Sequence, residues 1–397
     1  MPGRPNTGSN PERAKVLSDM RETASHTWIR PELRALTPYA VAAADGMVKL
    51  DAMENPYPWP QDLQAALQER LAAVAINRYP DPAGTALKER LRAAMGIADA
   101  QALLLGNGSD ELIQMLAMAV TQPGRVVMAP EPSFVMYRLI ADFVGLGYQG
   151  VPLLTDFQLD VDSMLGFIEA EQPALLFLAY PNNPTGNAWY REDIECLLEA
   201  CNGLVVVDEA YAPFAADSFV GDLGRFDNLL VLRTVSKMGL AGLRLGYLVG
   251  PPAIIDELNK LRLPYNINSL TQAAAELALD NKPLFDAQAA AIRQERERLW
   301  QALQTLPGIT PFPSQANFIL FRTPAGTGRQ VFAGLREAGI LIKDLSGQAG
   351  PLADCLRVTV GTPAENSQFL EALQTVLAAG PSSDSGLAGF SAAKAHP

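Results

Sequence analysis

The stretch LVVVDEAY (residues 204–211) ends an apolar run on a carboxylate, and this arrangement indicates the fold. Four consecutive apolar residues are typical of a strand that is buried on both faces, as in a parallel sheet covered by helices. Asp208 follows this run directly, and a carboxylate at the end of a buried strand costs free energy unless it is paired. We therefore expect Asp208 to meet either an arginine or a cationic ligand.

Similar apolar runs recur on both sides of this stretch and alternate with helical patterns. Further strands are expected at residues 102–105, 126–129, 175–179, 229–232 and 245–249, and helices at 110–120, 134–143, 191–200 and 252–261. This alternation predicts an α/β domain whose mostly parallel sheet lies between helices. Ligands are expected at the carboxyl ends of its strands.

The pattern changes after residue 283, where a smaller α+β domain is expected. A long amphipathic stretch (284–306) precedes expected strands at 317–321, 340–343 and 355–360 and expected helices at 329–338 and 363–378. The predicted layout has five parts. They are a mobile tail (1–27), an N-terminal segment joining the small domain (28–60), a large domain (61–283), a small domain (284–379) and a second mobile tail (380–397).

The composition of the 397 residues argues against several partners and locations. A net charge of −12 opposes nucleic-acid binding, because phosphate contacts need a basic surface. No apolar run reaches the roughly 18 residues that span a bilayer. The N-terminal residues have no apolar core of a secretory signal, so we expect a cytoplasmic protein that binds no membrane.

Histidine and cysteine usage narrows the chemistry further. His26 and His396 are the only two histidines, and both lie in the expected tails. This placement opposes a Ser-His-Asp hydrolase, a histidine-ligated metal site and a histidine general base. The three cysteines are scattered and have no zinc spacing, so no metal is expected. Lysine, tyrosine and carboxylates are left to transfer protons.

Three loops that follow expected strands carry residues suited to a ligand site. GNGSDE (106–111) opens a helix, where free N–H groups bind phosphate, although Ser109 could equally cap the helix. YPNNPTG (180–186) is a proline-rich turn in which an asparagine amide can reach a ligand at the strand end. TVSKMGLAGLR (234–244) holds Lys237 among small and apolar residues, which lower a lysine's pKa and favour the nucleophilic amine. A lone lysine in such a loop is otherwise usually solvent-exposed.

The sequence resembles the fold-type-I pyridoxal-phosphate (PLP) aminotransferases in four motifs that follow one another along the chain: GNGSDE (106–111), YPNNPTG (180–186), VVVDEAY (205–211) and TVSKMGLAGLR (234–244). Within that family it is most similar to the histidinol-phosphate aminotransferases. Further matching segments are LTPY (36–39), ENPYP (54–58), NRYPDP (77–82), EPSFVMY (131–137), NFILFR (317–322) and CLRVTVGT (355–362). The matches run in family order over roughly residues 28–378. The resemblance implies the PLP-transferase fold of type I, with a large and a small domain.

The resemblance also implies a cofactor site. Lys237 would bind PLP as a Schiff base and shuttle the substrate proton, and Asp208 would pair with the pyridine nitrogen. Phe134, where relatives often carry tyrosine, would stack on the ring. The other implied cofactor contacts are Asn183 and Tyr211 for the 3′-oxygen, and Gly108, Ser109, Asp110, Ser236 and Arg244 for the phosphate.

For substrates, the resemblance implies that Arg357 clamps an anionic group. Lys343 stands where many relatives have a second arginine, so preference for a phosphorylated substrate is open. Tyr39 and Asn55 are further expected substrate contacts. Tyr79 resembles a tyrosine that reaches the cofactor phosphate of a neighbouring subunit, which implies a homodimer, although a surface turn is the alternative. Tyr265 and Asn268 could project into the partner's site or simply pack.

The function expected from the resemblance is reversible amino transfer between L-histidinol phosphate and 2-oxoglutarate in L-histidine biosynthesis. A related aminotransferase acting on aromatic or other amino acids is one alternative, and a phospho-amino-acid decarboxylase of the same family is another. A non-enzymatic regulator with this fold is disfavoured, because about 27 residues before the folded body are too few for a DNA-binding module.

Overall fold

The computed structural model describes residues 28–34, 36–37 and 43–379. Residues up to Ala43 and residues from Ala44 on form two separate compact units. The first contributes one described helix, α2 (Pro31–Arg34), and every other element belongs to the second. The expected tails and Tyr39 lie outside the described residues. The predicted boundaries near residues 60 and 283 fall inside the second unit and stay predictions.

A seven-stranded sheet in the order β2-β8-β7-β6-β5-β3-β4 forms the centre of the second unit. Its strands are β2 (Ala102–Gly106), β3 (Val126–Glu131), β4 (Gly147–Pro152), β5 (Leu175–Ala179), β6 (Leu204–Asp208), β7 (Leu229–Thr234) and β8 (Gly246–Gly250). Only β8 runs antiparallel to its neighbours. The predicted α/β fold with a mostly parallel sheet is therefore confirmed, and six of the seven strands lie where they were expected.

The edge strand β4 is the one that the sequence did not predict. Its residues, GYQGVP, include two glycines and no apolar run. β4 pairs only with β3, and Val151 is its one buried residue. An edge strand needs little apolar surface, so its sequence carries little strand signal.

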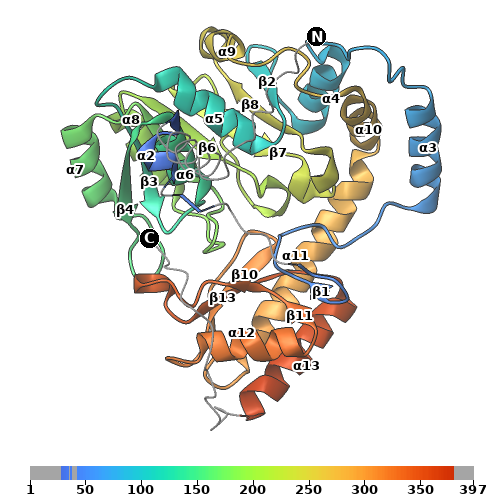
Figure 1. Ribbon diagram of the computed structural model, residues 1–397, viewed down its shortest axis with the longest axis vertical. Helices are drawn as coiled ribbons and strands as arrows, with labels where there is room; N and C mark the ends of the chain where they lie inside the picture. The colour runs from blue at the N-terminus through green and yellow to red at the C-terminus, as the bar shows by residue number, and fades with distance from the viewer. Residues whose placement is uncertain (1–27, 35, 38–42, 380–397) are drawn as a thin grey trace, which may run out of the picture. The chain divides into compact units, whose positions relative to one another are not determined.

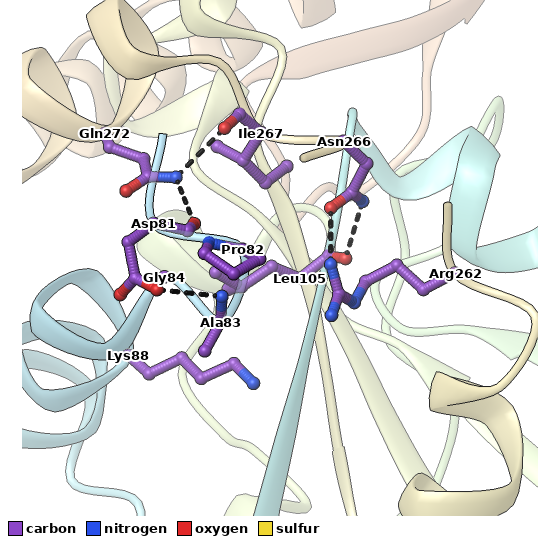
Figure 2. Close-up of a pocket in the computed structure, with 10 residues that line it drawn as sticks. All are labelled: Asp81, Pro82, Ala83, Gly84, Lys88, Leu105, Arg262, Asn266, Ile267 and Gln272. Atoms are coloured by element: carbon purple, nitrogen blue, oxygen red, sulfur yellow. Dashed lines mark hydrogen bonds between the residues drawn. The ribbon is translucent and has the colours of Figure 1, made fainter. Parts of the chain in front are cut away.

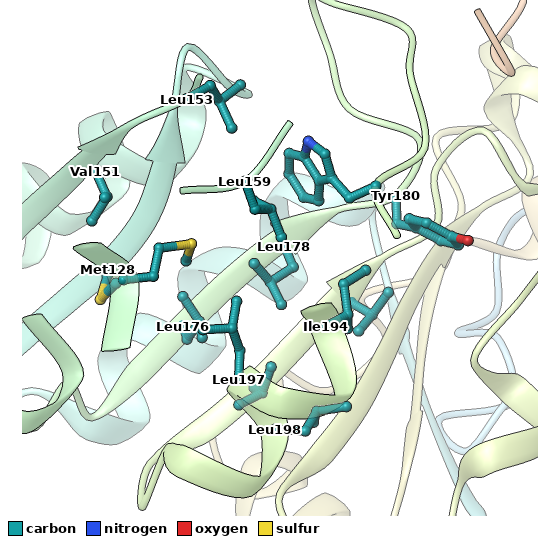
Figure 3. Packing of buried hydrophobic residues seen from close by; sticks show 14 of the residues in the cluster. Met128, Val151, Leu153, Leu159, Leu176, Leu178, Tyr180, Ile194, Leu197 and Leu198 are labelled. Atoms are coloured by element: carbon teal, nitrogen blue, oxygen red, sulfur yellow. The ribbon is translucent and has the colours of Figure 1, made fainter. Parts of the chain in front are cut away.

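Helices cover both faces of this sheet, as Figure 1 shows. They are α4 (Thr85–Met95), α5 (Ser109–Val120), α6 (Met136–Val144), α7 (Val161–Glu171), α8 (Arg191–Ala200), α9 (Pro252–Asn259) and α10 (Ser269–Asp280), while α3 (Gln61–Ala72) packs against α10. Val206 faces the core that contains side chains of α5, α6 and α9, and Val205 and Val207 face the opposite core, with α7 and α8. In that second core, strand residues such as Leu176 pack towards Leu197 of α8 (Figure 3). Burial on both faces explains the uninterrupted apolar runs.

The smaller sheet has the order β12-β13-β10-β9 and lies with helices α11, α12 and α13 (Figure 1). The strands are β9 (Thr310–Pro311), β10 (Phe318–Arg322), β12 (Lys343–Asp344) and β13 (Cys355–Thr359), and the helices are α11 (Lys282–Gln304), α12 (Gly328–Glu337) and α13 (Pro363–Ala379). The N-terminal strand β1 (Val48–Lys49) pairs in parallel with β11 (Ile340–Leu341). The strand expected at 340–343 is thus two short strands in different sheets.

Short 3-10 helices form several of the connections. They are η1 (Ala212–Phe214), η2 (Val220–Asp222), η3 (Ser236–Met238), η4 (Ala241–Leu243) and η5 (Gly350–Leu352). Within the described ranges, none of the helices is both long and apolar enough to cross a membrane. The same ranges contain no group of three or more histidine, cysteine or acidic side chains that could hold a metal ion.

Candidate active site

The carboxyl ends of three neighbouring parallel strands bring together the residues that the motifs single out. Ala179 at the end of β5 lies opposite Asp208 at the end of β6, and Asp208 lies opposite Leu232 of β7. The loops that leave these ends carry Asn183 and Lys237. Parallel strands end at one edge, so residues separated by more than fifty positions meet there.

Asp208 is buried and accepts two hydrogen bonds. Its side chain is 4% exposed, Oδ2 accepts from the Tyr137 hydroxyl at 2.7 Å, and Oδ1 accepts from the backbone N–H of Ala210 at 3.0 Å. Burial raises the pKa of Asp208 to about 6, and the two hydrogen bonds oppose that rise. Among the described residues no arginine or lysine forms an ion pair with it. Of the two partners expected from the sequence, a cationic ligand remains.

The buried carboxylate makes a testable contribution to stability. Because the pKa of Asp208 is higher in the folded protein than in the unfolded chain, raising the pH from about 4 to about 6 lowers the free energy of unfolding. The penalty amounts to about 3 kcal/mol above pH 7. Asp208→Asn protein, freed of cofactor, is therefore expected to resist urea better than wild type at pH 7.5 and equally near pH 4. Equal stabilities at both pH values would contradict this assignment.

Lys237 lies in η3, directly after β7, and its amine is held near the site. Its Nζ donates to the carbonyl of Ala52 at 3.2 Å and lies 6.0 Å from the ring centroid of Tyr211. Burial, followed by the positive charge of Arg357, lowers the pKa of Lys237 to about 8. The lowered pKa increases the neutral fraction of this amine to roughly a tenth at pH 7, and the neutral amine is a nucleophile and a proton acceptor. The solvent-exposed alternative for Lys237 does not hold, since the side chain is partly buried.

The glycine-rich loop packs closely against Arg244. Gly108 has φ +86°, and a Cβ added there would lie 2.6 Å from Nη2 of Arg244. The Arg244 guanidinium is also 3.7 Å from Asp110 and 3.5 Å from the Ser236 hydroxyl. Helix α5 begins at Ser109 with Gly108 at the N-cap and no side-chain cap, so Ser109 is not the helix cap. This leaves the first N–H groups of α5 beside a guanidinium, which is suited to an anion.

Arg357 joins the smaller sheet to the larger one. It lies on β13, is 5% exposed, and its Nη1 donates to the side-chain carbonyl of Asn183. Its Nη2 donates to the carbonyl of Asp51 at 3.1 Å. Lys343 on β12 is the direct cross-strand neighbour of Arg357. Two cations opposite each other repel, so an anion between them would be stabilising.

Three further residues organise the site, and the sequence did not single them out. Asn182 is fully buried and accepts from the Ser133 hydroxyl at 2.8 Å, while its amide donates to the Pro132 carbonyl at 3.0 Å. It thereby fixes the segment that leads to Phe134. Tyr137 binds Asp208, and Met53 accepts from the Tyr211 hydroxyl through its sulfur at 3.0 Å. Tyr137 belongs to the quoted segment EPSFVMY, whose spacing alone gave it no role.

Asn55 makes its hydrogen bonds within the protein. Its amide donates to the Met238 carbonyl at 3.2 Å and to Gln288 at 2.9 Å, and its carbonyl accepts from the N–H of Tyr57 at 2.9 Å. Asn55 therefore ties the N-terminal segment to the Lys237 loop. Its expected contact with a substrate stays a prediction.

Tyr79 projects from the surface and is not among the clustered residues. It is 80% exposed and stacks on Tyr265 with 4.4 Å between ring centroids. The segment that follows Tyr79 is bound by Gln272, whose amide donates to the carbonyls of Asp81 and Ile267. Figure 2 shows these three residues in the lining of a small pocket. Asn268 caps α10 by accepting from the Thr271 N–H at 2.9 Å, and its projection into a partner's site stays a prediction.

Comparison with known proteins identifies relatives over most of the chain. A family model described as aminotransferase class I and II matches residues 45–373. Histidinol-phosphate aminotransferase 2 of Nitrosococcus oceani is 56% identical over 347 residues, which are 87% of this chain and 96% of that protein. Histidinol-phosphate aminotransferase of Chromobacterium violaceum is 54% identical over 346 residues, 87% of this chain and 97% of that protein.

A solved structure supports the fold. The histidinol-phosphate aminotransferase from Sinorhizobium meliloti, in complex with pyridoxal-5′-phosphate, superposes with a TM-score of 0.79. The match covers 88% of this chain and 98% of that one, at 24% sequence identity. The large sheet, the small sheet and their order along the chain therefore follow a known architecture.

Proposed function

Since the chain belongs to the aminotransferase class I and II family, we propose that it is a histidinol-phosphate aminotransferase that uses PLP. It would transfer an amino group reversibly between L-histidinol phosphate and 2-oxoglutarate, giving imidazole acetol phosphate and L-glutamate, in L-histidine biosynthesis. The observation that carries the proposal is 56% identity, over 96% of its length, to a relative named for this activity.

The residues at the strand ends fit PLP. A buried carboxylate without a cationic partner among the described residues suits a protonated pyridine nitrogen, and the partly buried Lys237 suits an aldehyde. Gly108 has φ +86°, a conformation that other residues rarely adopt, and this turn beside the Arg244 guanidinium suits a phosphate in contact with backbone N–H groups. When bound, PLP supplies the electron sink that stabilises negative charge at the substrate carbon.

Each of these side chains then has one physical task. Lys237 Nζ would hold the cofactor aldehyde and would accept and return the proton of the substrate carbon. Asp208 keeps a proton on the pyridine nitrogen by its negative charge. Tyr211 and Asn183 orient the 3′-oxygen, Phe134 stacks on the ring, and Ser236 and Arg244 bind the phosphate with Gly108, Ser109 and Asp110.

Arg357 and Lys343 are proposed to bind the substrate anions. Arg357 offers a fork that fits a carboxylate or a phosphate, and the buried position strengthens each hydrogen bond. Lys343 lies next to it across the strand pair and adds a second positive charge without fork geometry. Together they suit a substrate with a phosphate, or a dicarboxylate such as glutamate.

We further propose a cytoplasmic homodimer in which Tyr79 reaches the partner's cofactor phosphate. Tyr79 and Tyr265 form a stacked pair at the surface, and Ile76 and Leu263 are each 70% exposed. Exposed apolar and aromatic side chains near one another in the sequence are typical of an interface. Stacking on Tyr265 restricts Tyr79 before any partner binds, which lowers the entropy lost on association.

A panel of amino donors with 2-oxoglutarate tests the proposed substrate. Histidinol phosphate is expected to exceed phenylalanine in kcat/KM by about 100-fold, because its phosphate gains charged hydrogen bonds that phenylalanine lacks. In Lys343→Met protein this preference is expected to fall by about tenfold, whereas Lys343→Arg, the matched control, should keep it.

The alternatives give different outcomes in the same panel. Rapid turnover of phenylalanine with none of histidinol phosphate would overturn the proposal in favour of an aromatic aminotransferase. Release of carbon dioxide from a phosphorylated amino acid, without consumption of 2-oxoglutarate, would indicate a decarboxylase.

A further inference from the structure

The hydroxyl of Tyr137 is the one side-chain donor that the described structure places on Asp208. The O–H···O distance is 2.7 Å, and both side chains are at most 4% exposed. Tyr137 belongs to α6 and Asp208 to β6, so this contact joins two elements 71 residues apart. A short hydrogen bond to a buried carboxylate is among the stronger polar contacts in proteins.

The Tyr137 ring is held rigidly on both sides. It stacks on Phe177 with 4.5 Å between centroids and 2° between planes, and it meets Phe134 edge to face at 5.5 Å. Phe134 is the residue proposed to stack on the cofactor ring. One fixed side chain therefore sets the position of Asp208 and contacts the stacking residue.

The charges that face Asp208 leave it in need of this donor. Asp110 from α5 and the adjacent Glu209 both disfavour its ionised form, as burial does. Glu209 is itself paired with Arg233 at 2.7 Å, so that guanidinium is already engaged. The hydrogen bonds from the Tyr137 hydroxyl and the Ala210 N–H both favour the carboxylate, and the Tyr137 bond has the larger effect on its pKa.

We propose that Tyr137 is a positioning residue that keeps Asp208 ionised and oriented towards the pyridine nitrogen, and so strengthens cofactor binding and electron withdrawal. The proposal rests on the proposed PLP function. In this proposal Tyr137 contacts neither the cofactor nor the substrate, and its effect on the cofactor is exerted through Asp208.

The test compares PLP binding by wild-type, Tyr137→Phe, Asp208→Asn and double-variant protein, by equilibrium dialysis after cofactor removal. Tyr137→Phe keeps the ring and its stacking and removes only the hydroxyl. It is expected to weaken PLP binding about tenfold and to lower kcat with little change in the KM for the amino donor. In the Asp208→Asn background the same change should have less than about a twofold effect, because its target charge is absent.

Tyr180→Phe is the matched control. Tyr180 is a buried tyrosine whose hydroxyl donates to another carboxylate, Asp217, at 3.3 Å, and loss of that hydroxyl should leave PLP binding unchanged. If Tyr137→Phe does not fold, Tyr137→His, whose shorter ring does not bring its N–H to the position of the tyrosine hydroxyl, replaces it and should likewise weaken PLP binding about tenfold.

The outcomes separate the two proposals. Wild-type protein that binds no PLP would refute the proposed function. Wild type that binds PLP while Tyr137→Phe binds it equally well, or an equal loss in both backgrounds, would overturn the role of Tyr137 alone. A folded Tyr137→His protein that binds PLP as tightly as wild type would overturn it as well.

Discussion

Lys237→Ala protein is expected to lose amino transfer, with kcat reduced about 10⁴-fold or more. The change removes both the covalent attachment of the cofactor and the base that moves the substrate proton, and such paired roles rarely leave residual activity. Burial and the charge of Arg357 lower the Lys237 pKa to about 8, and no other lysine of the described residues combines this shift with a place at the ends of β5–β7. Steady-state and single-turnover kinetics measure the loss.

Borohydride reduction followed by intact-mass measurement tests the attachment directly. Wild-type protein should gain one reduced PLP on Lys237, and Lys237→Ala protein should gain none. Lys237→Arg is the matched control, since it keeps a positive charge in the loop but offers no nucleophilic amine. Added small amines should restore part of the lost rate, because a diffusible base can replace the missing one. Cofactor that stays covalently bound to Lys237→Ala after dialysis would contradict the assignment.

Arg357→Leu is expected to reduce kcat/KM by about 10³-fold for both histidinol phosphate and glutamate. The guanidinium is buried, and its hydrogen bonds to Asn183 and to the Asp51 carbonyl fix its orientation. The substrate anion would therefore lose a preoriented bidentate partner in the variant. PLP affinity is expected to stay within about threefold of wild type, because the proposed phosphate and pyridine contacts come from other strands. Initial rates over a range of both substrates separate KM from kcat.

Two matched variants sharpen this result. Arg357→Lys keeps the charge and loses the fork, and it should recover only part of the lost kcat/KM. Arg322→Leu removes an arginine from the neighbouring strand β10, away from the proposed site, and it should change kcat/KM less than twofold. Equal losses in the Arg322 and Arg357 variants would show that the effect is structural and would refute the substrate role of Arg357.

The sequence predicted much of the fold because burial on both faces of a sheet leaves a direct trace. Runs such as residues 204–207 are apolar throughout, since alternate side chains enter different cores. The order of the motifs predicted that Asn183, Asp208 and Lys237 lie at one edge, because parallel strands all end there. Strand β4 was not predicted, because this glycine-rich edge strand has no apolar run and carries no ligand motif at its end.

The partners of the site residues could not be predicted from the sequence. Tyr137 and Asp208, Asn182 and Ser133, and Arg357 and Asn183 are pairs separated by 49 to 174 residues. No periodicity relates residues at such separations, and only the packing of α6 on the sheet and of the small sheet on the large one brings them together. The substrate roles of Tyr39 and Asn55 stay predictions of the resemblance.

The stretch around Asp208 shows which properties the sequence determined and which depended on the tertiary structure. Its sequence by itself determined a buried strand that ends on a carboxylate and the need for a compensating partner, because both follow from hydrophobicity and the free energy of burying charge. Only the tertiary structure decided that no arginine of the described residues forms an ion pair with it, that a tyrosine from helix α6 donates to it, and that its pKa is raised to about 6. These depend on which groups surround the carboxylate in three dimensions, and a linear pattern does not encode distances across the fold.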